Sequence, residues 1–185
     1  MFRLTEDAKD WYKKIKDSDN ATPLFSEEFD LYYFCLLFGL SEDQKEINEP
    51  LVDMSKNFTL KYKKSKEILL TFLMLRHAQK RKIKVSDKKS LQKLLDKFCD
   101  KESESGTGLS TAAIDTMNHY AAGGFPILRK IVPNFTNSVV AIDLIHKKLK
   151  SSLDKFSEIK FEILLLVILG FCKTQFLLLI SILSD

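Results

Sequence analysis

The sequence predicts an all-α fold: a compact multi-helix domain of about six or seven helices, followed by a very apolar C-terminal helical segment. Along most of the chain, apolar residues recur at the three- and four-residue spacing that gives an amphipathic helix its buried face. Six Gly and four Pro in 185 residues are too few for the many tight turns of a β-sandwich or barrel. The length fits one domain, which we assign to residues 1–156, with residues 157–185 as the apolar segment.

The first third of the chain predicts two helices and a loop. The first helix is expected over about residues 5–18, with Thr5 as its cap. Its apolar face consists of Leu4, Ala8, Trp11, Tyr12 and Ile15. The second helix begins after Ser26 and is apolar on nearly every side, which predicts a buried central helix stopped at Gly39; a β-strand is the alternative for its aromatic run. Residues 41–59 are polar and predict a long loop with one short turn.

The middle of the chain predicts two more helices. The third is expected over about residues 61–79, and residues 80–85 connect it to a fourth helix that Ser86-Asp87 opens. The apolar stripe of the fourth helix consists of Leu91, Leu94, Leu95 and Phe98. Residues 101–108 have the composition of a linker.

The second half predicts a fifth helix over Ser110–Ala122, stopped by Gly123-Gly124. Proline disfavours the helical conformation at the residue before it, so Pro126 should make the chain turn here, with one of the two glycines at positive φ. A short segment over residues 125–133 and a seventh helix over about residues 139–153 follow.

The apolar run Ile163–Leu183 has 21 residues, close to the length of about 20 that crosses a bilayer. Lys173 lies at its centre, where a charge is costly in lipid, so a helix buried in the core or at an oligomer contact is the first interpretation. A membrane anchor through residues 161–183 is the alternative. The charged N-terminus lacks the apolar run of a signal peptide, and the three cysteines are too far apart for a disulfide framework, so we expect a cytoplasmic protein. Cys35 and Cys172 lie inside apolar runs and are interpreted as core residues.

No catalytic constellation is visible, and the sequence contains no HExxH, GxSxG, GxGxxG or Walker pattern. Asp115 and His119, like Asp143 and His146, have a spacing that places an acid and a histidine on one helix face. We interpret both pairs as surface or capping histidines, and Gly106-Thr107-Gly108 as part of the linker. The sequence therefore predicts no enzyme, no metal site and no cofactor.

Charge is distributed unevenly along the chain. Residues 1–55 carry a net charge of −7, residues 56–97 carry +11, and residues 98–185 carry zero. The basic third either faces a polyanion such as nucleic acid, or lies against the acidic third or in solvent as ordinary helix faces. The candidate nucleic-acid-binding residues are Lys61, Lys63, Lys64, Arg76, Lys80, Arg81, Lys82, Lys84, Lys88 and Lys89.

Two stretches resemble a known family. Phe29–Leu40 is similar to the aromatic helix, closed by Gly, of small helical proteins associated with bacterial DNA phosphorothioation (Dnd) loci, and Met117–Phe125 resembles their Tyr-Ala-x-Gly-Gly-hydrophobic stretch. Since these are phage-defence and restriction loci, the resemblance implies a non-enzymatic accessory role that engages DNA or the protein partners of a DNA-handling complex. The alternative is a protein-interaction or membrane-tethered subunit attached through the apolar C-terminal segment, and a homo-oligomer stays open.

Overall fold

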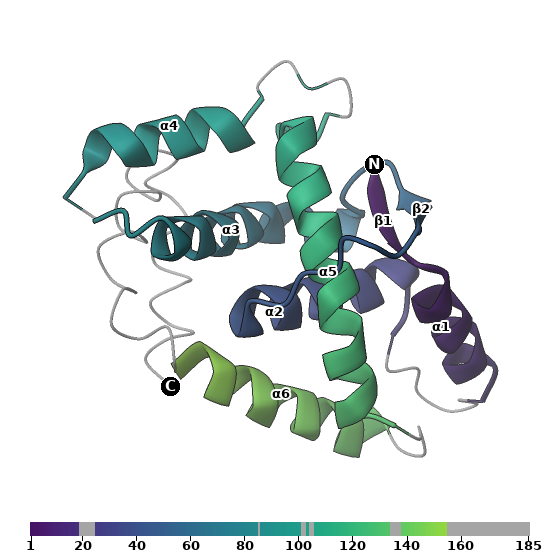
Figure 1. Cartoon of the computed structure of the whole chain (residues 1–185). Coiled ribbons are helices and arrows are strands. Elements are labelled where there is room, and N and C mark those ends of the chain that lie inside the picture. The colour runs from purple at the N-terminus through teal and green to yellow at the C-terminus, as the bar shows by residue number, and fades with distance from the viewer. Residues whose placement is uncertain (19–24, 85, 101–102, 104–105, 134–137, 155–185) are drawn as a thin grey trace.

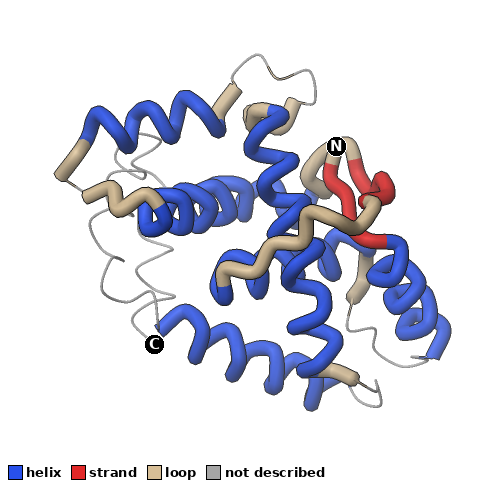
Figure 2. The backbone as a smooth tube through the Cα atoms, viewed as in Figure 1, coloured by secondary structure: helices blue, strands red, loops and turns tan. Residues whose placement is uncertain are grey.

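The computed structural model describes residues 1–18, 25–84, 86–100, 103, 106–133 and 138–154, and these residues form a mostly helical fold with one small sheet (Figure 1 and Figure 2). The elements in chain order are β1 (Phe2–Thr5), α1 (Glu6–Ser18), α2 (Glu28–Glu42), β2 (Leu51–Ser55), the 3-10 helix η1 (Leu60–Ser65), α3 (Lys66–Lys80), α4 (Lys88–Phe98), α5 (Thr111–Ile131) and α6 (Ser138–Asp154). The predicted helical fold is confirmed at this level. The predictions for residues 157–185 lie outside the described residues.

Two strands were not predicted. β1 pairs antiparallel with β2, and β2 lies within residues 41–59, where the sequence predicts a loop. Arg3 and Asp53 lie opposite each other, and Arg3 Nε donates to Asp53 Oδ1 at 2.8 Å. Phe2 and Leu4 alternate with Arg3 and are fully buried, which is the strand pattern, but four residues carry it too briefly to be recognised without the partner strand.

α2 is the central helix, as predicted, and it contacts α1, α3, α5, α6 and β2. The expectation that Gly39 stops this helix is wrong, because α2 continues to Glu42 and ends at Asp43 in the left-handed conformation, φ 55°. Gly39 lies instead where α2 and α5 touch: a Cβ on Gly39 would stand 1.8 Å from the Tyr120 carbonyl oxygen. The glycine therefore allows two helix backbones to approach each other closely.

The predicted stop at Gly123-Gly124 is also wrong, because α5 runs unbroken through both glycines and through Pro126. Neither glycine has positive φ; among the described residues the glycines with positive φ are Gly106 and Gly108. A Cβ on Gly124 would lie 1.8 Å from the Cys35 carbonyl oxygen. Packing against α2 therefore outweighs the low helix propensity of two glycines and a proline.

The two stretches quoted for the family resemblance meet at this α2–α5 contact. Asn118, which is 1 % exposed, joins them to the sheet through a satisfied hydrogen-bond network. Its Oδ1 accepts from the Tyr32 hydroxyl and from the Arg3 backbone N–H, both at 3.0 Å, and its Nδ2 donates to the Met1 carbonyl oxygen. Phe2, Tyr32 and Phe29 stack their rings edge-on or tilted beside this network. The quoted stretches are thus packing elements of the core.

α1, α4 and α6 agree with the predictions, but the separate short segment predicted over residues 125–133 is wrong, because α5 continues to Ile131. Asp87 caps α4, its Oδ1 accepting from the Ser90 N–H at 3.0 Å, and Ser110 caps α5, its Oγ accepting from the Ala113 N–H at 3.1 Å. The third helix starts later than predicted, since its first turns are the 3-10 helix η1. On α6, the apolar side chain of Ile142 is 54 % exposed.

Candidate nucleic-acid interface

The structure divides the ten predicted basic residues between the two ends of α3. Lys61, Lys63 and Lys64 lie in η1 at its start. Since α3 has 15 residues, its ends are about 22 Å apart. The remaining residues follow the last turns of α3, the connection beyond it and the first turn of α4 (Figure 1). We call the group at this second end the α3–α4 edge, and it consists of Lys80, Arg81, Lys82, Lys84, Lys88 and Lys89.

Three of the ten residues bind acids or carbonyls of the first third of the chain. Arg76 donates from Nε to the Leu40 carbonyl oxygen at 2.7 Å and from Nη2 to the Ser41 carbonyl oxygen at 2.8 Å. Only 14 % of its side chain is exposed, so it closes the C-terminal end of α2. Lys80 Nζ lies 3.0 Å from Asp43 Oδ1. For these residues, the basic third of the chain therefore lies against the acidic third, which was one of the two interpretations of the charge pattern.

Lys61 is the third of these residues, and its acid partner is the buried Asp30. Lys61 Nζ lies 2.5 Å from Asp30 Oδ1, the Tyr62 hydroxyl donates to the same oxygen, and Ser26 donates to Oδ2 from its N–H and its hydroxyl. Burial acts to raise the pKa of Asp30, but the hydrogen bonds from Lys61, Tyr62 and Ser26 outweigh it and hold that pKa below its ordinary value. Asp30 is therefore ionised, and its carboxylate joins the start of α2 to η1.

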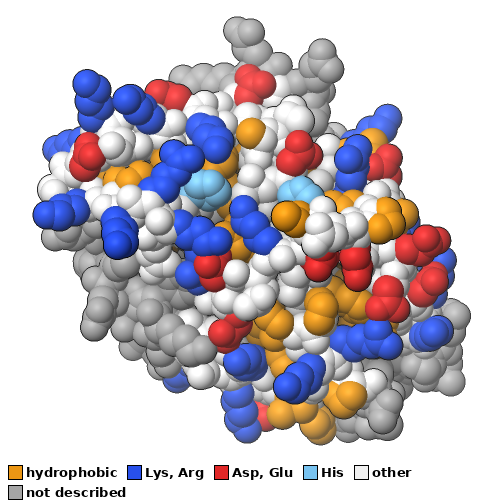
Figure 3. Space-filling view, in the orientation of Figure 1, with side chains coloured by type: hydrophobic (Ala, Val, Ile, Leu, Met, Phe, Trp, Pro, Cys, Tyr) orange, Lys and Arg blue, Asp and Glu red, His pale blue; other side chains and the backbone are white. Residues whose placement is uncertain are grey.

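The other cations of the α3–α4 edge are exposed to solvent. Arg81, Lys82, Lys84, Lys88 and Lys89 are all exposed, and none of them makes an ion pair with another described residue. Figure 3 shows Lys and Arg side chains gathered over α4 and the end of α3. Lys82 has φ 52°, a left-handed turn in which the Ile83 N–H donates to the Ala78 carbonyl oxygen at 2.9 Å. This turn reverses the chain, so that the cations of the connection and of α4 share one edge.

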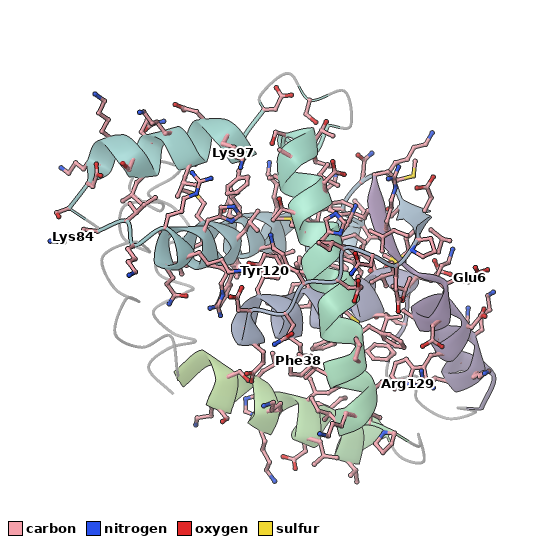
Figure 4. All side chains as sticks on the ribbon, viewed as in Figure 1. Glu6, Phe38, Lys84, Lys97, Tyr120 and Arg129 are labelled. Atoms are coloured by element: carbon pink, nitrogen blue, oxygen red, sulfur yellow. The ribbon has the colours of Figure 1, made fainter. Side chains whose placement is uncertain are left out.

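A second group of cations was not predicted. Lys45, after α2, Lys97, in the last turn of α4, and Lys80 are close enough to His77 of α3 for their charges to act on it. We call these four side chains the His77 cluster. Figure 4 shows Lys97 at the end of α4 that faces α3 and α5, whereas Lys84 lies at the far end of the edge. The ring of His77 stands edge-on to Phe98 at 4.8 Å, and Lys97 Nζ lies 5.5 Å from the centre of the same Phe98 ring.

The positive charges of the His77 cluster act on one another. Burial lowers the pKa of His77 to about 4, and the charges of Lys45, Lys97, Arg81 and Lys80 contribute to the decrease. Burial likewise lowers the pKa of Lys45, together with the charges of Lys80 and Lys97, while Asp43 opposes the decrease. At neutral pH, His77 is therefore an uncharged imidazole among cations.

The acid–histidine pairs hold no joint site in the described residues. His119 Nδ1 lies 2.8 Å from the Glu46 carbonyl oxygen, and Asp143 pairs with Lys147 at 2.7 Å. Within the described ranges, no group of three His, Cys, Asp or Glu side chains is placed to hold a metal ion. Cys35 is fully buried, as predicted, and its burial raises the pKa of its thiol. Cys172 lies outside the described residues.

The segment after α2 and the C-terminal half of α5 line an open groove of about 1030 Å³. Its walls mix acids and bases, with Glu42 and Glu46 on one side and Arg129 and Lys130 on the other. The described residues that line it include no His, Cys or Ser, so they supply neither a nucleophile of these kinds nor an imidazole base.

Within the part of the chain that the structure describes, no helix is long and apolar enough to cross a membrane. The chain matches no family model, no curated protein and no solved structure at a significant level.

Proposed function

We propose that this protein is a non-enzymatic accessory protein that engages DNA, or a complex that handles DNA, through the α3–α4 edge. The observation that carries the proposal is the set of exposed cations there without an acid partner among the described residues: Arg81, Lys82, Lys84, Lys88 and Lys89. Internal neutralisation explains Lys61, Arg76 and Lys80, but it does not extend to these five. Several cations on one edge suit a phosphate backbone, which gives salt-dependent binding without sequence preference.

The resemblance to proteins of Dnd loci agrees with this proposal and suggests its setting, a bacterial DNA-modification or phage-defence system. The stretches that carry the resemblance form the α2–α5 contact and supply the scaffold beneath the basic elements. The α3–α4 edge would supply the contact with DNA.

The test is a titration of duplex DNA at several salt concentrations. The variant Arg81→Gln/Lys84→Gln/Lys88→Gln/Lys89→Gln removes four charges and leaves Lys82 in its left-handed turn unchanged. The slope of log K against log salt is negative, and each lost phosphate contact makes it less steep by about 0.9. We therefore expect the magnitude of the slope to decrease by about 3.6, with a large loss of affinity at low salt.

The matched control is Lys63→Gln/Lys64→Gln, which removes exposed cations at the opposite end of α3. It should keep the slope of the unchanged protein. Equal losses in the two variants would show that net charge alone drives binding, and the absence of binding by the unchanged protein at low salt would end the proposal.

A second proposal is attachment to a protein partner or a membrane through residues 161–183. The observation that favours it is the apolar surface of α6, the helix that precedes this segment, where Val140, Ile142 and Leu144 are 56 %, 54 % and 42 % exposed. Carbonate extraction of the full chain from cells tests it. Recovery in the membrane pellet supports a membrane tether, whereas a soluble protein with the sedimentation of a monomer contradicts both forms of attachment.

A further inference from the structure

We propose that the His77 cluster is a binding site for a phosphate group, either as free phosphate or as part of a phosphate ester. The inference goes beyond the proposed DNA contact, because Lys45, His77 and Lys97 are outside the ten predicted residues. Its variants also leave the α3–α4 edge intact, so the two proposals fail independently.

The fold holds the segments that carry the cluster in place. Lys45 belongs to a short segment that hydrogen bonds hold on both sides: the Gln44 N–H donates to the Gly39 carbonyl oxygen at 2.9 Å, and the Glu46 N–H donates to the His119 carbonyl oxygen at 3.0 Å. The Lys45 side chain lies over the Tyr120 ring, with Nζ 4.5 Å from its centre. The backbone of Lys45 is therefore fixed between α2 and α5.

The other two lysines are also placed by tertiary contacts. Lys80 is held by its ion pair with Asp43, whose Oδ1 also accepts from the Tyr120 hydroxyl at 3.0 Å. The carbonyl oxygen of Lys97 accepts from the Ser110 hydroxyl at 2.7 Å, which joins the end of α4 to the start of α5. Cations from three separate segments therefore converge at positions that the core determines.

The charges around the His77 cluster are mostly positive. The charged and titratable groups that act on this region are Glu42, Asp43, Lys45, Arg76, His77, Lys80, Arg81, Lys97, His119 and Tyr120. Glu42 is paired with Lys148 at 2.9 Å. Asp43 pairs with Lys80 at 3.0 Å, Arg76 donates to two carbonyl oxygens at the end of α2, and a helix C-terminus contributes only about half a negative charge. Lys45, Arg81 and Lys97 make no ion pair with another described residue, so a bound anion would relieve the mutual repulsion of their charges.

The side chains of the His77 cluster offer hydrogen-bond donors that suit an anion. The Nδ1 atom of His77 is buried and has no hydrogen-bond partner among the described residues. The lysines around it offer ammonium groups with several donors each, and the side chains of Lys45, Lys80 and Lys97 are exposed to solvent. A phosphate group carries up to two negative charges and several acceptor oxygens, which matches three converging ammonium groups better than a single carboxylate does.

The experiment is an NMR titration of the histidine ring protons of the full chain, which contains three histidines. With chloride as the anion, His77 should titrate near the low pKa of about 4. When inorganic phosphate replaces chloride at equal ionic strength, the nearby negative charge should raise the pKa of His77 by about 1 or more. The ring signals of His146, on α6, serve as the internal reference and should not respond to phosphate.

Two further arms identify the source of the phosphate and the residues that bind it. A response of His77 to inorganic phosphate supports a discrete site, and a response only to a duplex oligonucleotide assigns the site to a backbone phosphate. In Lys45→Gln/Lys97→Gln, the pKa of His77 should rise in chloride alone and show no further increase with phosphate, whereas Lys63→Gln/Lys64→Gln should behave as the unchanged protein. If neither ligand shifts His77, or if all three histidines shift equally, the inference is wrong.

Discussion

Substituting Gly124 by alanine tests the close contact of α2 and α5 directly. The added Cβ would lie 1.8 Å from the Cys35 carbonyl oxygen and 2.6 Å from the Gly39 backbone nitrogen. Both obstacles are backbone atoms of a central helix, so no side chain can rotate away. Restoring an ordinary separation of about 3.5 Å requires the two helices to move apart by more than about 1 Å, which weakens dispersion contacts along the whole interface.

We therefore expect Gly124→Ala to lower the free energy of unfolding by at least about 3 kcal/mol, at or above the upper end of ordinary overpacking. For a chain of this size, that loss corresponds to a decrease in Tm of about 6–12 °C. Thermal melting followed by circular dichroism, together with a urea titration, measures both quantities.

Gly106→Ala is the matched control. Gly106 has φ +64° with nothing within 4 Å of an added Cβ, so its substitution costs only the backbone strain of about 1 kcal/mol. If Gly124→Ala melts within the range of Gly106→Ala, the contact is not closely packed, and our account of why α5 tolerates two glycines is refuted.

Three other outcomes follow from the buried charges. Asp30→Asn should lower stability by about 3 kcal/mol in a urea titration, because it removes the charged acceptor shared by Lys61, Tyr62 and Ser26. The pKa of His77 is about 4 in the folded protein and about 6.5 in the unfolded chain, so the unfolded chain binds the proton first. Stability should therefore fall by about 2 kcal/mol as the pH drops from about 6.5 to about 4, and it should fall less in His77→Asn. Arg76→Met should lower stability by about 2 kcal/mol, since it frees the carbonyl oxygens at the end of α2, and should leave the salt slope of DNA binding unchanged.

Sequence reasoning succeeded where the signal is local. The first helix and α4 have a capping side chain at one end and an apolar stripe at the spacing of one helix face, and both were found. It failed where a distant segment decides the outcome. The strand β1 exists because β2, about 50 residues further along, pairs with it, and α5 continues through Pro126 because α2 packs against it.

The candidate site shows the same division. A dense run of lysines identified the α3–α4 edge, because neighbours in the sequence stay neighbours across one turn. The same run placed Arg76 among the DNA contacts, although its guanidinium closes the end of α2. Lys45 lies in the acidic third of the chain, and no local pattern relates it to Lys97 or His77. Only the meeting of the ends of α2, α3 and α4 brings these three together.

The close contact of α5 with α2 also fixes part of the His77 cluster. A Cβ on Gly123 would lie 2.5 Å from the Gln44 carbonyl oxygen and 2.8 Å from the Lys45 backbone nitrogen, so the segment that carries Lys45 rests directly on α5. The close approach of α2 and α5 thus sets where Lys45 stands relative to His77. The two stretches quoted for the resemblance, Phe29–Leu40 and Met117–Phe125, make this contact, and so they help to set the position of the Lys45 backbone. The proposed phosphate site would therefore depend on this packing for the position of one of its lysines.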